Sequence, residues 1–222
     1  VDFTAKGTPI TVALATGQAA DWTWSEAWSA FDGHDAVADT PTFPYIYKGI
    51  IPVIDFNTST LNEEADSPDA AYWSRAGGSD ADRAFSVGAW VKLRDATNST
   101  ILSKFNEAND TREWIFYFDG SDLLNLYLVD EDAVGNTIHA ARSGAMTTSE
   151  GQWHFFVAAY DGTVGGGTGK VLLYRDAVSQ TVTVGAGTPW AGTDQMRVKA
   201  SPVRLANYNA TPAELMKGQM AG

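Results

Sequence analysis

The chain has 222 residues, 44% hydrophobic and 19% charged, which is enough length and apolar content to bury a sizeable core. With 27 acidic and 15 basic residues its formal net charge is −12, and a surface this acidic repels phosphate backbones, so we expect no nucleic-acid partner. The absence of cysteine excludes disulfides and thiolate metal sites, and no stretch reaches the ~20 apolar residues that cross a bilayer, so we expect no membrane partner.

The N-terminal segment, residues 1–44, is predicted to be an irregular arm with one short strand at residues 9–15. Its stretch DWTWSEAW holds three tryptophans within seven residues: Trp22, Trp24 and Trp28. The spacing fits two rings on one face of a strand or two on one face of a helix, so it does not decide the local structure. Exposed rings outside a core would favour association, so we expect them to anchor the arm, on its own domain or on a neighbouring protein, rather than to form an open sugar platform.

The segment after the arm begins with residues 45–57, which are rich in β-formers, and continues with polar, turn-like residues 58–83. From residue 84 the pattern is that of strands. In AFSVGAWVKL (84–93) apolar residues recur at every second position, as in a strand with one face in a core. Further strands are predicted at residues 99–105, 152–162, 170–176 and 179–185, with a last strand or pair within 195–208.

The stretch EWIFYFDGSDLLNLYLVD (113–130) predicts a β-hairpin around Gly120. Pairing Phe118 with Leu124 places every apolar residue of one face together, and a slip of one residue would spoil both faces. We predict that this face lies in the core; its members are Trp114, Phe116, Phe118, Leu124, Leu126 and Leu128. About a dozen short strands with almost no helix predict an all-β sandwich.

The order and spacing of five stretches resemble the concanavalin A-like, laminin-G-like jelly-roll family over residues 45–222: FSVGAWVKL, TILSKF, WIFYFDGSDLLNLYL, GQWHFFVAAYDG and GKVLLYRDAV. GIIPVIDFN and EEADSPDAAYW, with the ending LMKGQMAG, resemble a narrower branch found in structural proteins of tailed phages and other viruses. The resemblance implies an antiparallel two-sheet jelly roll that follows the arm, and it leaves open whether the domain is truncated at its C-terminus.

The resemblance also raises the question of calcium, which family members often hold at one rim. They use an Asp after a Phe-Asp-Gly-type strand and a second Asp near a C-terminal Gly-x-Ile-Asp. Here Asn57 follows Phe56, and Ala221 stands where the second Asp would be. Because calcium takes about 6–8 oxygen ligands, we expect no cofactor; Asp55 and Asn57 are the remaining candidate ligands.

Glucanases related by this resemblance carry two glutamates and an aspartate on one strand, and the nearest counterpart here is EADSPD (residues 64–69). Pro68 breaks a strand and the neighbours are turn formers, so we expect a solvated acidic loop. The chain has no Gly-x-Ser-x-Gly elbow, and its three histidines lie far apart in sequence. We therefore expect the protein not to be an enzyme.

Aromatic residues make the case for ligand binding. In the predicted hairpin Tyr117, Asn125 and Tyr127 lie on the face away from the core, where they would stack on a sugar and hydrogen-bond to it, or pack under another segment or a partner subunit. Trp73 and Trp190, in predicted loops, are further candidates for stacking on a sugar.

These features together lead us to expect a non-enzymatic structural module of a virion. It would decorate a capsid or project from it to touch a host surface. Its partners would be other virion proteins or further copies of the chain, with a surface glycan as an additional ligand. The alternative is a secreted carbohydrate-binding module, and a glucanase ranks third.

Overall fold

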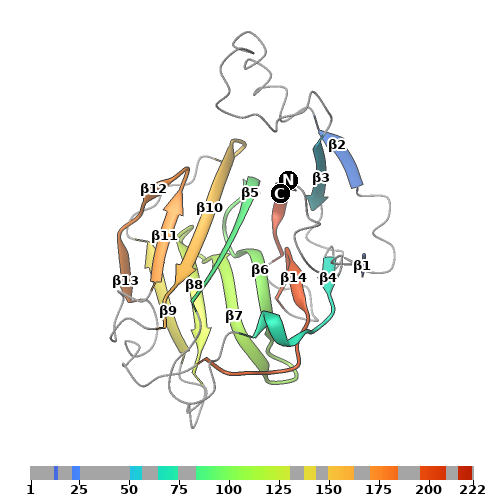
Figure 1. Ribbon diagram of the computed structural model, residues 1–222. Helices are drawn as coiled ribbons and strands as arrows, with labels where there is room; N and C mark the ends of the chain where they lie inside the picture. The colour runs from blue at the N-terminus through green and yellow to red at the C-terminus, as the bar shows by residue number, and fades with distance from the viewer. Residues whose placement is uncertain are drawn as a thin grey trace, which may run out of the picture.

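The structure is a computed structural model that describes residues 13–14, 22–25, 51–56, 65–74, 84–130, 138–143, 150–162, 171–184, 196–208 and 215–221. Two antiparallel sheets face each other across one apolar core (Figure 1). The predicted all-β, two-sheet sandwich is thereby confirmed. In the described ranges the helical structure is a single 3-10 turn, η3 (Ala71–Trp73), and no helix there has the length and apolar character to cross a bilayer.

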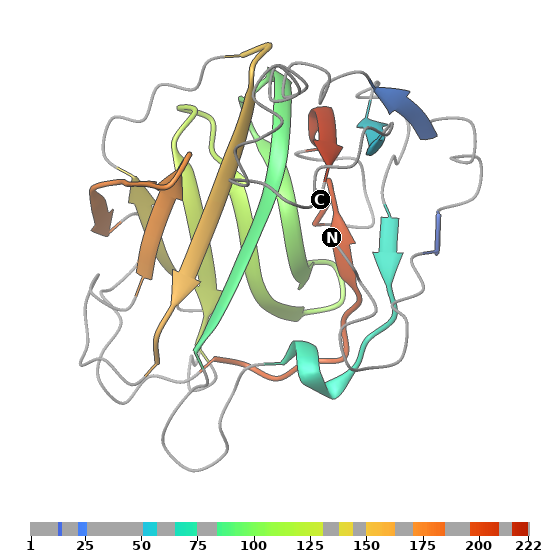
Figure 2. The same ribbon diagram turned by 45° about the horizontal axis from the view of Figure 1, so that its top comes forward.

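Within the residues that the structure describes, sheet A has eight strands. In spatial order they are β1 (Ala13–Leu14), β4 (Ala65–Ser67), β14 (Val203–Leu205), β6 (Ser99–Asn106), β7 (Thr111–Phe118), β8 (Leu124–Val129), β9 (Ile138–Ser143) and β13 (Val182–Val184). Sheet B has seven. In spatial order they are β12 (Val178–Ser179), β11 (Val171–Arg175), β10 (Trp153–Tyr160), β5 (Phe85–Asp95), β15 (Lys217–Ala221), β3 (Ile51–Phe56) and β2 (Trp22–Ser25). Figure 2 shows β5 and β10 of sheet B lying across the strands of sheet A.

The hairpin of β7 and β8 has the predicted register, with Phe118 opposite Leu124 and Trp114 opposite Leu128. All six residues predicted for the core face are at most 2% exposed. The turn is fixed by the Asp119 carboxylate, whose Oδ1 accepts hydrogen bonds from the backbone N–H groups of Ser121 (2.8 Å) and Leu123 (3.2 Å). The side-chain alternation and the turn residues therefore specify the same pairing.

The acidic stretch at residues 64–69 was predicted to be a solvated loop, and this is wrong for its middle part, because Ala65–Ser67 form β4. The strand pairs with β14, and the carboxylate of Asp66 lies 3.4 Å from Nε of Arg204 on that strand. Three residues contain no strand pattern of their own. They become a strand because they pair with the edge of β14. Tertiary context often overrides a weak β-propensity in this way.

Two strands come from the predicted arm. The backbone of β1 pairs with β4 in sheet A, and that of β2 pairs with β3 in sheet B, with Trp22 opposite Ile54 and Trp24 opposite Pro52. The side chains of these two tryptophans, and Trp28 entirely, lie outside the described residues. The anchoring role of the rings and the division of the chain at residue 44 stay predictions.

The strand β15 lies in the middle of sheet B, between β5 and β3. Its register shifts between Lys217 and Gly218, and a Cβ atom at Gly218 would collide with the carbonyl oxygen of Lys92 on β5. Only glycine permits so close an approach of the two backbones.

Candidate functional site

The outward face of sheet A carries a second, smaller apolar cluster. Phe105, Ile115 and Val129 are buried there, and the tyrosine rings that pack against them are partly buried: Tyr117, Tyr127 and Tyr208. We call these six residues the tyrosine face. Its rings meet edge to face, at centroid distances of 5.8 Å for Phe105 and Tyr127, 5.5 Å for Phe105 and Tyr208, and 6.3 Å for Tyr117 and Tyr127. This arrangement suits the ring quadrupoles and covers the aliphatic residues beneath.

The trio predicted to bind sugar is brought together on this side of sheet A, but its members differ in exposure. Tyr117 and Tyr127 keep some exposed surface, whereas Asn125 is fully buried and its Nδ2 donates to the carbonyl oxygen of Leu123 at 2.5 Å. Burial, together with the nearby Tyr117, raises the pKa of Tyr127 well above its usual range, so its phenol stays a protonated donor. Trp73 packs against the inner core instead, and Trp190 lies outside the described residues.

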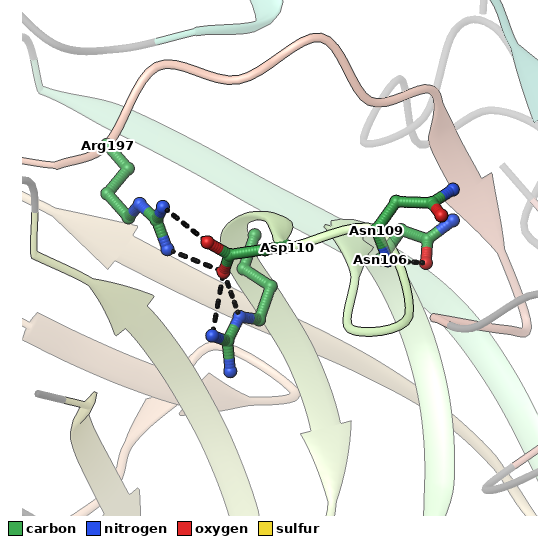
Figure 3. Close-up of polar contacts among 5 residues, drawn as sticks. Asn106, Asn109, Asp110 and Arg197 are labelled. Atoms are coloured by element: carbon green, nitrogen blue, oxygen red, sulfur yellow. Dashed lines mark hydrogen bonds and ion pairs between the residues drawn. The ribbon is translucent and has the colours of Figure 1, made fainter. Parts of the chain in front are cut away.

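The turn between β6 and β7 carries an exposed carboxylate held by two arginines. Oδ1 of Asp110 accepts hydrogen bonds from Nη2 of Arg112 (2.7 Å) and Nη1 of Arg197 (3.0 Å), and its Oδ2 accepts one from Nη2 of Arg197 (3.1 Å) (Figure 3). The bonds from Arg197, and then those from Arg112, hold the pKa of Asp110 far below its usual range. In the same turn Oδ1 of Asn106 accepts from the backbone N–H of Asn109. The ion pair between Asp110 and Arg197 fastens the segment around Arg197 to the turn.

A β-bulge beside this turn points an acid into the protein. The pairing runs from Lys104 opposite Trp114 directly to Phe105 opposite Arg112, so Glu113 is the extra residue of the bulge. Glu113 and Lys104 are both 0% exposed, and Oε1 of the acid lies 2.7 Å from Nζ of the lysine. Without the bulge, strict alternation would direct Glu113 and Trp114 to opposite faces of the sheet.

Polar groups from three other segments contact the buried pair of Lys104 and Glu113. Lys104 Nζ also contacts the carbonyl oxygen of Lys199 (2.5 Å) and Oδ1 of Asp69 (3.0 Å). Glu113 Oε1 accepts from the backbone N–H of Lys199 (2.6 Å) and from Oγ of Ser74 (3.0 Å). Burial raises the pKa of Glu113 in spite of these bonds, the strongest of which is that from Lys104. The network therefore ties the chain before and after η3 and the segment around Lys199 to sheet A.

This network was not anticipated from the sequence. A bulge leaves no mark in the hydrophobic pattern, so the inward position of Glu113 could not be deduced. Lys104 left a weak signal, because it interrupts the apolar stretch TILSKF at a strand position. A lysine there predicts either an exposed site or a buried partner of opposite charge.

The outward face of sheet B is also apolar, and its residues remain partly exposed. The register places Trp90 beside Phe155, and Val157 between Gly88 and Tyr174. The rings of Trp90 and Phe155 are 5.3 Å apart. We call the large apolar residues on the outward side of β5, β10 and β11 the sheet-B face: Trp90, Trp153, Phe155, Val157, Leu172 and Tyr174. Leu172 is the most exposed of them, at 46%.

This face was missed in the sequence, although a signal was present. In WHFFVAAY both alternating sets are apolar, so a strand with one solvated face does not account for the pattern. The inward set is Phe156, Ala158 and Tyr160, which leaves Trp153, Phe155 and Val157 to face outward.

The tight turn between β11 and β12 is fastened to β10 beside this face. Asp176 and Ala177 both have positive φ angles, of 51° and 64°. Oδ1 of Asp176 accepts from the backbone N–H of Phe155 (2.9 Å), and Oδ2 lies 2.7 Å from Nδ1 of His154. Burial alone would raise the pKa of Asp176, but these two partners outweigh it and lower the pKa.

Asp55, the described member of the candidate calcium pair, is engaged by other side chains. Its Oδ1 and Oδ2 accept from Nη2 of Arg94, at 2.6 Å and 2.8 Å, and its Oδ2 also accepts from Nε2 of Gln219 at 3.1 Å. Asn57 lies outside the described residues. In the parts of the chain that are described, no group of three or more His, Cys, Asp or Glu side chains is placed to hold a metal ion.

Comparisons with known proteins identify the family. Residues 67–215 match the family model of the concanavalin A-like lectin/glucanases superfamily. Because the match covers more than half of the chain, the chain belongs to this superfamily, and the broader of the two predicted resemblances is confirmed. No curated protein matches the sequence. Among solved structures, the native heptameric SAP-like pentraxin from Limulus polyphemus is similar at 16% identity with a TM-score of 0.42, over 64% of this chain and 63% of that chain.

Proposed function

We propose that this member of the superfamily is a non-enzymatic structural module of a virus particle, which decorates the capsid or projects from it and is held by neighbouring proteins. The observation that carries the proposal is the sheet-B face, where six large apolar side chains lie side by side and remain partly exposed. Contiguous apolar patches on a soluble protein mark surfaces for protein contact. The resemblance of GIIPVIDFN and LMKGQMAG to virion proteins supports placing this contact in a particle.

The surroundings of the carboxylates support a role without catalysis. A glycosidase needs an acid and a nucleophile or base that face the sugar from opposite sides. Here Asp66 is paired with Arg204, while Asp69 and Glu113 are both paired with Lys104. The ion pairs of these three carboxylates hold neighbouring segments of the chain together.

The proposal is tested on particles purified from the natural source. We expect mass spectrometry to find this chain in the particle at a fixed ratio to the main shell protein, resistant to a salt wash because the contact is apolar. Recovery of the chain in the soluble secreted fraction, with none in washed particles, would contradict the proposal.

A secreted carbohydrate-binding module remains the second candidate, because Tyr117 and Tyr127 keep exposed surface on one side of sheet A. The discriminating experiment compares the wild type, Tyr127→Ala and the matched control Tyr174→Ala on a polysaccharide panel. Our proposal expects no binding by any of the three proteins. Binding that Tyr127→Ala abolishes and Tyr174→Ala keeps, with both variants folded by circular dichroism, would establish the carbohydrate-binding module instead.

A further inference from the structure

We propose that the side chains of Lys104 and Asp69 condense to an amide bond, formed by the folded chain itself with Glu113 as the proton carrier. The ion pairs described above are the state before this reaction. The cross-link is a modification site that lies outside the proposed function and does not depend on it. Its grounds are the burial of the amine and of the acid beside it, and the position of a second carboxyl group on the same nitrogen.

The amine and the acid beside it are closed off from solvent. Lys104 and Glu113 are both 0% exposed, and Nζ lies 2.7 Å from Oε1. Oε2 of Glu113 is buried without a hydrogen-bond partner among the protein atoms, so donors stabilise only one of its two oxygens. Burial raises the pKa of Glu113, and this carboxyl therefore takes up a proton more readily than one in water. A desolvated lysine beside a proton acceptor is a nucleophile in waiting.

A second carboxyl group meets the same nitrogen from the segment between β4 and η3. Oδ1 of Asp69 lies 3.0 Å from Nζ of Lys104, and the side chain of Asp69 is 40% exposed. A water molecule released at this carboxyl therefore has a way out to solvent. Groups that a fold holds in reacting geometry reach effective concentrations of ~10⁵–10⁸ M, so a condensation that does not occur between free acids and amines in water becomes accessible within one chain.

The three N–H bonds of the ammonium each have an acceptor with a part in the reaction: Oδ1 of Asp69, Oε1 of Glu113 and the carbonyl oxygen of Lys199. The first proton passes to Oδ1 of Asp69, which leaves the lone pair of Nζ facing that carboxyl group. Nζ then forms a bond to the carboxyl carbon, while Oε1 of Glu113 takes the second proton and delivers it to Oδ1. The bond between the carbon and Oδ1 breaks, and Oδ1 leaves as water with both protons.

The product keeps the remaining contacts of the site. The third proton stays on Nζ, which continues to donate to the carbonyl oxygen of Lys199 as an amide N–H. Oδ2 of Asp69 becomes the amide oxygen, and Glu113 returns to its starting protonation state. The reaction needs no oxidant, metal or co-reactant. It replaces a buried ammonium by a neutral group, so the cost of keeping that charge away from water is removed.

The test is the mass of the intact, folded chain, followed by high-resolution mass spectrometry during incubation at neutral pH. We expect a species that is lighter than the sequence mass by one water molecule and that accumulates with time. Lys104→Arg, which keeps the positive charge, and Asp69→Ala, which removes the carboxyl group, should not form it. A wild-type chain that keeps the full mass of its sequence would overturn the inference.

Peptide mapping locates the bond and separates it from other losses of water. An aspartate also loses water when it cyclises onto its own backbone, so the intact mass is not sufficient by itself. We expect trypsin to leave the chain uncut after Lys104, and tandem mass spectrometry to find the peptide with Lys104 joined to the peptide with Asp69. Loss of water without joined peptides would contradict the cross-link.

The chain contains its own matched control for proximity. Nζ of Lys217 lies 2.6 Å from Oδ2 of Asp95, but these side chains are 36% and 38% exposed, so we expect no joined peptides there. Glu113→Gln keeps the size of the side chain and removes the proton carrier, so we expect it to slow the accumulation strongly with an unchanged circular dichroism spectrum. Joining of Lys217 to Asp95 as well, or an unchanged rate in Glu113→Gln, would overturn the role assigned to the buried acid.

Discussion

The outward face of sheet A is covered by the chain itself, whereas the outward face of sheet B is left partly open. On sheet A the segment after β14 folds back over β6, where Oγ of Ser103 donates to the carbonyl oxygen of Asn207 (2.7 Å) and the ring of Tyr208 reaches Phe105. On sheet B the side chain of Leu172, opposite Ala159 of β10, is 46% exposed. Both faces have outward apolar residues, so side-chain alternation decides which residues point outward, and contacts distant in sequence decide whether they are covered.

The largest expected effect comes from the network that fastens sheet A. Lys104→Met leaves Glu113 buried without its cation, so we expect a loss of about 3–5 kcal/mol of unfolding free energy at pH 7. Urea denaturation measures it. The control is Lys92→Met, a partly exposed lysine on the outward side of sheet B, for which we expect little change. Equal losses of unfolding free energy in the two variants would show that the buried network on sheet A contributes no more than a partly exposed lysine on sheet B.

The loss should also depend on pH. Burial raises the pKa of Glu113. A carboxyl whose pKa is higher in the folded than in the unfolded state stabilises the fold at a pH below its unfolded pKa. This stability is lost as the pH rises through the folded pKa. Lys104→Met should therefore be less damaging near pH 4 than at pH 7. Denaturation at both pH values measures this difference, and an effect that grows on acidification would contradict the assignment.

The two faces are compared directly by two aliphatic truncations. Ile115 is 5% exposed on the tyrosine face, so Ile115→Ala should cost about 2–5 kcal/mol, as in a core. Leu172→Ala on the sheet-B face should stay within about 0.5 kcal/mol, because a half-exposed side chain gives up little burial. Chemical denaturation measures both. Similar costs would remove the distinction between a covered face and an open one.

A smaller effect is expected at the exposed clamp on Asp110. Its pKa is depressed by Arg197 and Arg112, so the stability it contributes is present above the unfolded pKa of about 3.9 and is lost as pH falls through the folded value. Arg197→Ala should change the melting temperature little at pH 7 and make the fall in stability below pH 4 shallower. Thermal melts across this range measure it. An unchanged acid slope would mean that Arg197 does not hold this carboxylate.

The smallest effect is expected from chelation. Because both oxygens of Asp55 are engaged by Arg94, we expect excess chelator to leave the melting temperature unchanged for the wild type. A fall that calcium reverses would reveal a metal site and contradict this expectation.

The hairpin of β7 and β8 was predictable because alternation over five residue pairs and the chemistry of the turn between them agree, without help from distant residues. The strand β4 was not predictable, because three residues, Ala65 to Ser67, become a strand only through the edge of β14. The inward turn of Glu113 depends on a bulge, and a bulge is an insertion relative to a partner strand that the sequence of one strand does not reveal. Of the predicted sugar trio, alternation placed all three residues on one face but could not show that Asn125 would be buried there.

The central place of β15 in sheet B has a consequence for how the protein is made. In the described part of sheet B, β3 and β2 reach β5 only through Lys217–Ala221, which are translated after every other strand named here. Until those five residues leave the ribosome, sheet B has two unjoined parts, and the nascent chain presents open strand edges and apolar surface to its surroundings. The sandwich therefore closes late and through contacts that span most of the chain, so we expect folding to be completed only after β15 has been made.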